Sequence, residues 1–163
     1  SSKQKEQYRK KGKDILKAFY KHHESQWRVP ERLEGGFTLL IGDYHVRGKI
    51  DRIDLRDDGT LEIIDYKTGR PKDKLTSTDK DQLLLYQIAA QQLPEYRNGG
   101  EVGALTYYYL DNDSTLSFLG QDKDTERLEK KMIKILDEIH ATDWSQVTVR
   151  SHNERHVGID QVN

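Results

Sequence analysis

The residues with the clearest chemical capacity are two aspartates and a lysine in two short apolar stretches. Asp51 stands in Gly48–Asp54 (GKIDRID), and Asp65 and Lys67 stand in Ile63–Gly69 (IIDYKTG). Both stretches are rich in β-branched and aromatic residues and are bounded by turn residues, which predicts β-strands. Side chains two positions apart in a strand project from the same face, so Asp65 and Lys67 are expected to project together.

A tight turn between the two stretches predicts that they form a hairpin. The turn is Asp57–Thr60 (DDGT), and it would bring Asp51 next to the strand that carries Asp65. Two carboxylates and an ammonium group on one sheet face indicate a divalent-metal site of a phosphodiesterase, because Mg²⁺ takes carboxylate, water and phosphate oxygens as ligands. Lys67 would hold the attacking water and offset the charge of the phosphate. Taken alone, Asp65 and Lys67 have a simpler interpretation as an ion pair on a solvated strand face.

The segment from Gly48 to Gln87 resembles the RecB-type branch of the PD-(D/E)XK nuclease superfamily. The match runs through GKIDRID, then IIDYKTG, then QLLLY at Gln82–Tyr86, and weaker matches extend it to about residues 8–110. The three parts in this order are far more specific than any one of them. The pattern of elements and the resemblance together predict an α/β fold, with a central mixed β-sheet flanked by helices in a restriction-endonuclease-like PD-(D/E)XK core.

The resemblance also implies a role for each motif residue. Asp51 and Asp65 would bind Mg²⁺ or Mn²⁺, and the main-chain carbonyl of Tyr66 would complete the coordination. Lys67 would support the nucleophilic water. The expected catalytic residues are therefore Lys67, Asp65 and Asp51, and the expected metal ligands are Asp51, Asp65 and Tyr66.

Four further residues are expected to contact DNA. Gln82 and Tyr86 are four residues apart, so they share one face of the predicted helix that follows the motif. In the family that this chain resembles, this pair faces the active site or the DNA, whereas core packing is the alternative for Tyr86. Arg70 and Lys72 lie in a basic loop after the metal motif, where a phosphate backbone would enter, and they predict salt-sensitive affinity.

Two features of many RecB-type nucleases are missing from this chain. One is a metal-ligating histidine in a Gly-x-x-x-His pattern on an N-terminal helix. His22 or His23 on the first predicted helix is a candidate replacement, and a solvent-facing or already satisfied histidine is the alternative. The other feature is an iron–sulfur cluster, which cannot form because the chain has no cysteine. The chain begins at Ser1 without methionine, which favours truncation as the reason for the missing histidine.

The composition predicts one domain over residues 1–163, with a core at about 8–140 and a loosely ordered tail at 141–163. Hydrophobic and charged residues each make up 34% of the chain, so a highly charged surface is expected. No apolar run approaches the roughly 20 residues of a membrane span, and no signal-peptide pattern is present. We therefore expect no membrane association and a cytoplasmic location, with which the absence of cysteine agrees.

Hydrophobic periodicity predicts helices at about 3–25, 79–93 and 122–140 and strands at about 32–41, 44–56, 61–67, 104–110 and 115–119. The first helix is strongly basic, which predicts either a solvated face or a DNA contact. It also carries a partial apolar stripe, formed by Tyr8, Ile15, Leu16, Phe19 and Tyr20. In the fourth strand Tyr107 and Tyr109 share one face and Tyr108 the other, which favours sheet aromatics over a base-stacking platform.

Together these features predict a metal-dependent DNA nuclease domain that hydrolyses phosphodiester bonds. The resemblance implies a place in a helicase–nuclease of DNA repair or recombination. No Gly-x-x-x-x-Gly-Lys-Ser/Thr motif is present, so the helicase would be another part of the parent protein or a partner subunit. One alternative is a catalytically inactive DNA-binding or scaffolding module, against which the intact Asp51, Asp65 and Lys67 argue. The other is a structural domain that contacts protein, but no exposed apolar face is obvious in the sequence.

Overall fold

The computed structural model describes residues 2–25, 27–97 and 99–143. The elements are α1 (Ser2–His23), β1 (Arg32–Ile41), β2 (Tyr44–Leu55), β3 (Leu61–Lys67), α2 (Ser77–Gln92), α3 (Pro94–Arg97), β4 (Val102–Tyr109), β5 (Ser114–Phe118) and α4 (Asp122–Ala141). All the expected helices and strands are present, and α3 is a single turn that the periodicity does not predict. Residues 144–163, most of the expected tail, lie outside the described residues.

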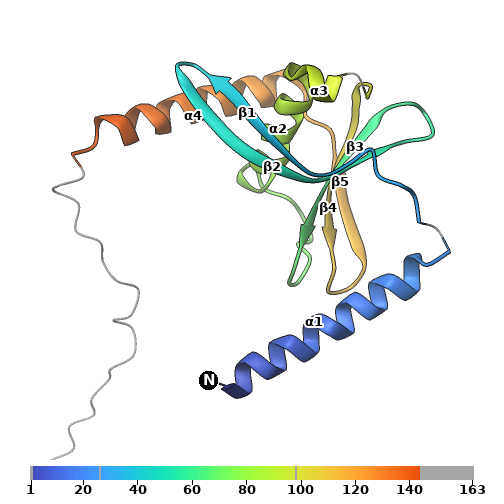
Figure 1. Ribbon diagram of the computed structural model, residues 1–163. Coiled ribbons are helices and arrows are strands. Elements are labelled where there is room, and N and C mark those ends of the chain that lie inside the picture. The colour runs from blue at the N-terminus through green and yellow to red at the C-terminus, as the bar shows by residue number, and fades with distance from the viewer. Residues whose placement is uncertain (1, 26, 98, 144–163) are drawn as a thin grey trace, which may run out of the picture.

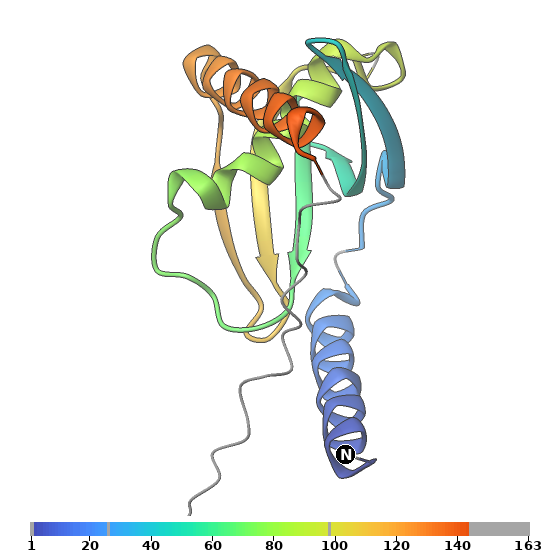
Figure 2. The ribbon, with the colours of Figure 1, turned by 90° about the vertical axis from the view of Figure 1, so that its left-hand side faces the viewer.

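The five strands form one mixed sheet in the order β1-β2-β3-β4-β5. Only β3 and β4 pair in parallel, and the other neighbours are antiparallel. A parallel pair needs a crossover connection, which α2 supplies. Helices α2 and α4 cover one face of the sheet (Figures 1 and 2), and α1 lies by the other face, where Phe19 contacts Tyr66 and Tyr108. The fold is therefore the expected α/β arrangement of a central mixed sheet with flanking helices.

The core lies between the sheet and α2. Ile53 of β2 pairs with Ile63 of β3, and both are almost fully buried beneath α2 together with Leu83. A capping box fixes where α2 begins, because Thr76 Oγ1 accepts from the Asp79 amide and the Asp79 carboxylate accepts from the Thr76 amide. This fixed start determines which residues of α2 face the sheet.

Helix α1 lies largely exposed. None of its residues, all of which the structure describes, is buried. Tyr8, Leu16 and Tyr20 of the expected apolar stripe are 75%, 60% and 60% exposed. Phe19 of the stripe contacts Tyr66 and Tyr108, whereas these three residues stay largely exposed. None of the described helices combines the length and the apolar character that crossing a bilayer requires.

Candidate metal site

The hairpin of β2 and β3 brings the two aspartates together. Regular pairing between the strands ends at Arg52 and Ile64, and Asp51 and Asp65 are the next residues in this register. Side-chain alternation therefore places Asp51 and Asp65 on the same face of the sheet. Here the Tyr66 N–H donates to Asp51 Oδ2 over 3.1 Å. The Asp51 side chain thus accepts a hydrogen bond that a main-chain carbonyl accepts elsewhere in the ladder. The end of the ladder thus holds the Asp51 carboxylate against the main chain of β3.

Asp65, Lys67 and Gln82 form a closed set of polar contacts. Lys67 Nζ lies 2.6 Å from Asp65 Oδ2 and donates to Gln82 Oε1 over 2.8 Å. The amide nitrogen of Gln82 donates to Asp65 Oδ1 over 2.8 Å and to the Tyr86 hydroxyl over 2.9 Å. The structure therefore brings together five of the expected site residues, Asp51, Asp65, Lys67, Gln82 and Tyr86. Tyr86 is 7% exposed and packs in the core, and its hydroxyl contacts Gln82.

Asp65 is a carboxylate in a buried position. It is 2% exposed, and no other charged side chain in the described part of the chain is buried. Burial raises the pKa of Asp65, Lys67 opposes this rise, and the charge of Asp51 adds to it. Among the described residues, Asp65 Oδ2 has no hydrogen-bond partner of ordinary geometry, although the Lys67 ammonium lies at ion-pair distance. Such an atom is rare in native proteins and marks a functional position or an absent ligand.

This donor set fits a hard divalent cation. Lys67 neutralises one of the two carboxylates, Asp51 and Asp65, which leaves a net negative charge at a partly buried position. A cation at Asp65 Oδ2 would take over the position that the Lys67 ammonium, 2.6 Å away, holds in this structure. Carboxylate oxygens and the Tyr66 carbonyl are the ligands that Mg²⁺ and Mn²⁺ prefer, since both ions favour oxygen over nitrogen or sulfur.

Tyr107 supports Lys67 in a way that the sequence does not indicate. In the parallel register Tyr107 pairs with Asp65, and the Lys67 ammonium lies 5.0 Å from the centre of the Tyr107 ring, a cation–π distance. The Tyr107 hydroxyl donates to the main-chain oxygen of Asp79 over 2.6 Å, and burial raises its pKa, so the ring stays neutral. The tyrosines of β4 alternate as predicted, but the sequence does not indicate that β4 lies next to β3.

A pocket of about 310 Å³ opens beside Lys67 and Gln82, and it is also lined by Lys72, Leu75, Thr78, Asp79, Tyr107 and Tyr109. Lys72 pairs with Asp79, which lowers the pKa of Asp79 to about 2. Arg70 is exposed at the end of β3 and forms no ion pair with the residues that the structure describes. Of the two basic residues expected to contact DNA, Arg70 is therefore the less constrained.

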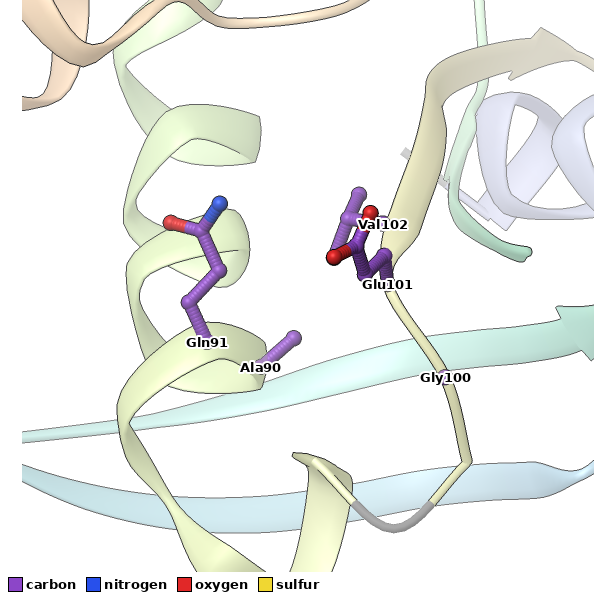
Figure 3. A pocket seen from close by; sticks show the side chains of 5 residues that line it. All are labelled: Ala90, Gln91, Gly100, Glu101 and Val102. Atoms are coloured by element: carbon purple, nitrogen blue, oxygen red, sulfur yellow. The ribbon is translucent and has the colours of Figure 1, made fainter.

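A larger pocket, of about 510 Å³, lies at the opposite end of α2 between Ala90 and Gln91 and the start of β4 (Figure 3). Val102 lines it and is the partner of Leu61, the first residue of β3, whereas Lys67 is the last. Six residues of strand, roughly 20 Å, separate the two positions. This pocket contains none of the expected site residues.

The structure does not bring His22 or His23 to the carboxylates. His23 Nε2 lies 2.6 Å from the Tyr108 hydroxyl. Tyr108 projects from the sheet face opposite to Tyr107 and Asp65, because side chains alternate along β4. The geometry therefore favours the interpretation of satisfied histidines over that of a ligand at the Asp51 and Asp65 site.

Residues 2–152 match the family model of the PD-(D/E)XK nuclease superfamily, and the chain belongs to this superfamily. Its members are generally nucleases, which hydrolyse phosphodiester bonds and typically use divalent metal ions. Among curated proteins, none matches the chain. The crystal structure of SSO0001 is similar at 21% sequence identity and a TM-score of 0.44, over 76% of this chain. The chain spans 59% of the length of that protein.

The motif residue Gly48 provides a packing test of the site. A Cβ atom at Gly48 would lie 2.3 Å from the Phe37 ring, which packs edge-on against Tyr86 at 5.9 Å between ring centres. Gly48→Ala should therefore displace Phe37 and lower the free energy of unfolding by about 1–3 kcal/mol. Gly36→Ala is the matched control, because nothing lies within 4 Å of a Cβ there. Urea denaturation measures both, and equal midpoints for the two variants would show that the Phe37 contact is unimportant.

Proposed function

We propose that this chain is a metal-dependent DNA nuclease domain that hydrolyses phosphodiester bonds. The observation that supports it most is the buried Asp65 carboxylate, which shares one sheet face with Asp51 and lies 2.6 Å from the Lys67 ammonium. An ordinary surface ion pair would leave such a carboxylate exposed to water. Membership of a superfamily of nucleases supports the same conclusion.

In this proposal each site residue has a separate task. Asp51, Asp65 and the Tyr66 carbonyl would hold Mg²⁺ or Mn²⁺, which would supply charge neutralisation at the phosphate and activation of water. Lys67 would orient the attacking water and offset negative charge on the phosphate, since its side chain is 36% exposed and lines the pocket. Gln82 would keep Lys67 and Asp65 at a fixed spacing through its two amide contacts.

Arg70 is proposed as the first phosphate contact of the DNA outside the site. Arg70→Ala should weaken DNA binding at all sequences and reduce the dependence of log affinity on log salt by about one unit. Arg47→Ala, which removes an exposed arginine from β2, is the control and should leave the slope unchanged. Fluorescence anisotropy at several salt concentrations measures both slopes. Equal slopes for the two variants would remove Arg70 from the proposed DNA path.

The larger protein and the process in which this domain acts are also proposals. The order of the three motifs supports a RecB-type nuclease, and a helicase in the parent protein or in a partner subunit would deliver the DNA during repair or recombination. The proposed unit is one domain in a cytoplasmic protein. Lys72, Gln82 and Tyr86 would join Arg70 in contacting the DNA.

The main alternative is a DNA-binding or scaffolding module without activity. It is favoured by one observation, that no described histidine reaches Asp51 or Asp65. Two measurements on the full chain separate the possibilities: binding of a labelled oligonucleotide, and its cleavage with Mg²⁺ or Mn²⁺. A nuclease should do both, with cleavage lost in Lys67→Ala and binding kept. Binding without cleavage would indicate the inactive module. Absence of both binding and cleavage would indicate a structural domain.

A further inference from the structure

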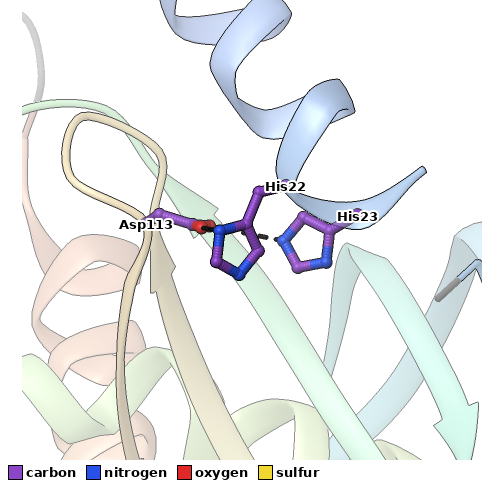
Figure 4. Close-up of side chains that lie close together, drawn as sticks. All are labelled: His22, His23 and Asp113. Carbon is purple, nitrogen blue, oxygen red and sulfur yellow. Dashed lines mark hydrogen bonds and ion pairs between the residues drawn. The ribbon is translucent and has the colours of Figure 1, made fainter. Parts of the chain in front are cut away.

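A second cluster of potential metal ligands lies on the other side of the sheet, where the last turn of α1 meets the turn between β4 and β5 (Figure 4). His22 Nδ1 lies 2.9 Å from Asp113 Oδ2, and His23 Nε2 lies 3.3 Å from Asp113 Oδ1. One ligand atom from each residue lies within 4.8 Å of the other two. Two ligands at roughly 2.0–2.1 Å from a tetrahedral ion are about 3.3 Å apart, so small adjustments would allow all three to share one ion.

We propose that His22, His23 and Asp113 bind a zinc ion that joins α1 to the β4–β5 turn. Two imidazole nitrogens and one carboxylate oxygen suit Zn²⁺, whereas Mg²⁺ prefers oxygen ligands alone. A fourth position would be filled by water, and the Tyr108 hydroxyl, which lies 2.6 Å from His23 Nε2, would release that nitrogen to the ion. This set differs in chemistry and in location from the carboxylates of the candidate nuclease site.

The surroundings favour a cation at this point. The basic residues of the last turn of α1 include both histidines, and the carbonyl end of a helix attracts positive charge. Asp113 holds a left-handed backbone angle, with φ +57°, which a short polar side chain tolerates and which fixes the tight turn that presents the carboxylate. The partly buried His23 and Asp113 side chains, each 26% exposed, are already in contact.

The proposed ion would have a structural task. No residue of α1 is buried, and its contacts with the sheet include the ring contacts of Phe19 with Tyr66 and Tyr108 and the 2.6 Å ion pair of Lys11 with Asp111. His23 and Asp113 are 90 residues apart, so a metal bridge between them would close a long loop and stabilise the attachment of the helix.

Calorimetric titration of Zn²⁺ into the full chain tests the proposal. The titration uses an Asp51→Asn/Asp65→Asn background, so that the other site cannot bind the ion. We expect one equivalent of zinc, a higher melting temperature with zinc, and no competition from Mg²⁺. Replacing either histidine with alanine should weaken zinc binding by more than about 100-fold, since even the loss of a residue behind a ligand costs about 10–100-fold.

Two further variants make the result decisive. Asp113→Asn keeps the turn but removes the carboxylate, so it should also weaken binding if the cluster is the site. His45→Ala removes an exposed histidine of β2 and should change nothing. Absence of zinc binding would reduce the cluster to hydrogen-bonded ion pairs and overturn the proposal. Zinc binding that survives replacement of both His22 and His23 would overturn it as well, and would place the ion on other residues.

Discussion

An Asp65→Asn variant is expected to lose cleavage and yet to melt at a higher temperature than the wild type when no divalent cation is present. Cleavage should fall by at least about 10²- to 10³-fold, because asparagine is neutral and cannot replace a carboxylate ligand. Stability should rise because burial, together with the charge of Asp51, raises the pKa of Asp65 by more than Lys67 lowers it. The folded protein therefore holds this carboxylate in its charged form at a net cost, which asparagine removes.

The dependence of stability on pH shows whether the buried charge of Asp65 causes this gain in stability. The folded state binds the proton of Asp65 more tightly than the unfolded state, so the contribution of Asp65 to stability falls as the pH rises from 3.8 through the raised pKa. The advantage of Asp65→Asn should therefore be present at neutral pH and disappear in acid below that range. Melting curves of the variant and the wild type, recorded with a chelator across this pH range, measure the difference in stability.

Asp57→Asn is a suitable control for the stability measurement. Asp57 is exposed and pairs with Arg28, which lowers its pKa, so asparagine there should give no gain in stability at neutral pH. A lower melting temperature for Asp65→Asn than for the wild type would mean that the contact with Lys67 outweighs the cost of burial.

Lys67→Ala is expected to reduce cleavage by about 10²- to 10³-fold while leaving Mn²⁺ binding intact. The substitution removes a positive charge 2.6 Å from Asp65, so the carboxylates lose a competing cation and their affinity for a divalent ion should not fall. Asp51→Asn, by contrast, should lose Mn²⁺ binding and cleavage together. Calorimetry with Mn²⁺ and single-turnover cleavage give the two readouts.

The matched control for Lys67 is Lys49→Ala. Lys49 lies on β2 two residues before Asp51, but its described ion pair is with Glu34, over 2.5 Å. The Lys49→Ala substitution should leave both cleavage and Mn²⁺ binding unchanged. If Lys67→Ala loses Mn²⁺ binding together with cleavage, then Lys67 serves the architecture of the site, and its proposed role with the attacking water is wrong.

Most of the fold is predictable because local patterns determine it. The hairpin turn at Asp57–Thr60 and the alternation in β3 fix which side chains point toward α2, and both are visible in the sequence. The spacing of Gln82 and Tyr86 places them on one helix face, and the structure confirms this. The single turn α3 was missed because four residues are too few to show a helical period.

Contacts between distant segments were harder to predict. The contact of Lys67 with Tyr107 depends on which strand lies next to β3, and parallel pairing leaves no local mark. The end of the β2–β3 ladder, where Asp51 accepts from the Tyr66 amide, depends on how far two strands stay together. The partial apolar stripe of α1 is visible in the sequence, but a periodic pattern identifies a face and not the element that covers it.

The most direct test of the nuclease assignment is the cleavage rate of a labelled single-stranded oligonucleotide across a Mg²⁺ titration. Wild type is compared with the Asp51→Asn/Asp65→Asn double variant, after circular dichroism has shown that both are folded. The wild-type rate should rise with Mg²⁺ and saturate, and the double variant should show no cleavage at any concentration. Cleavage by the double variant at the wild-type rate would contradict the assignment of Asp51 and Asp65 as the metal site.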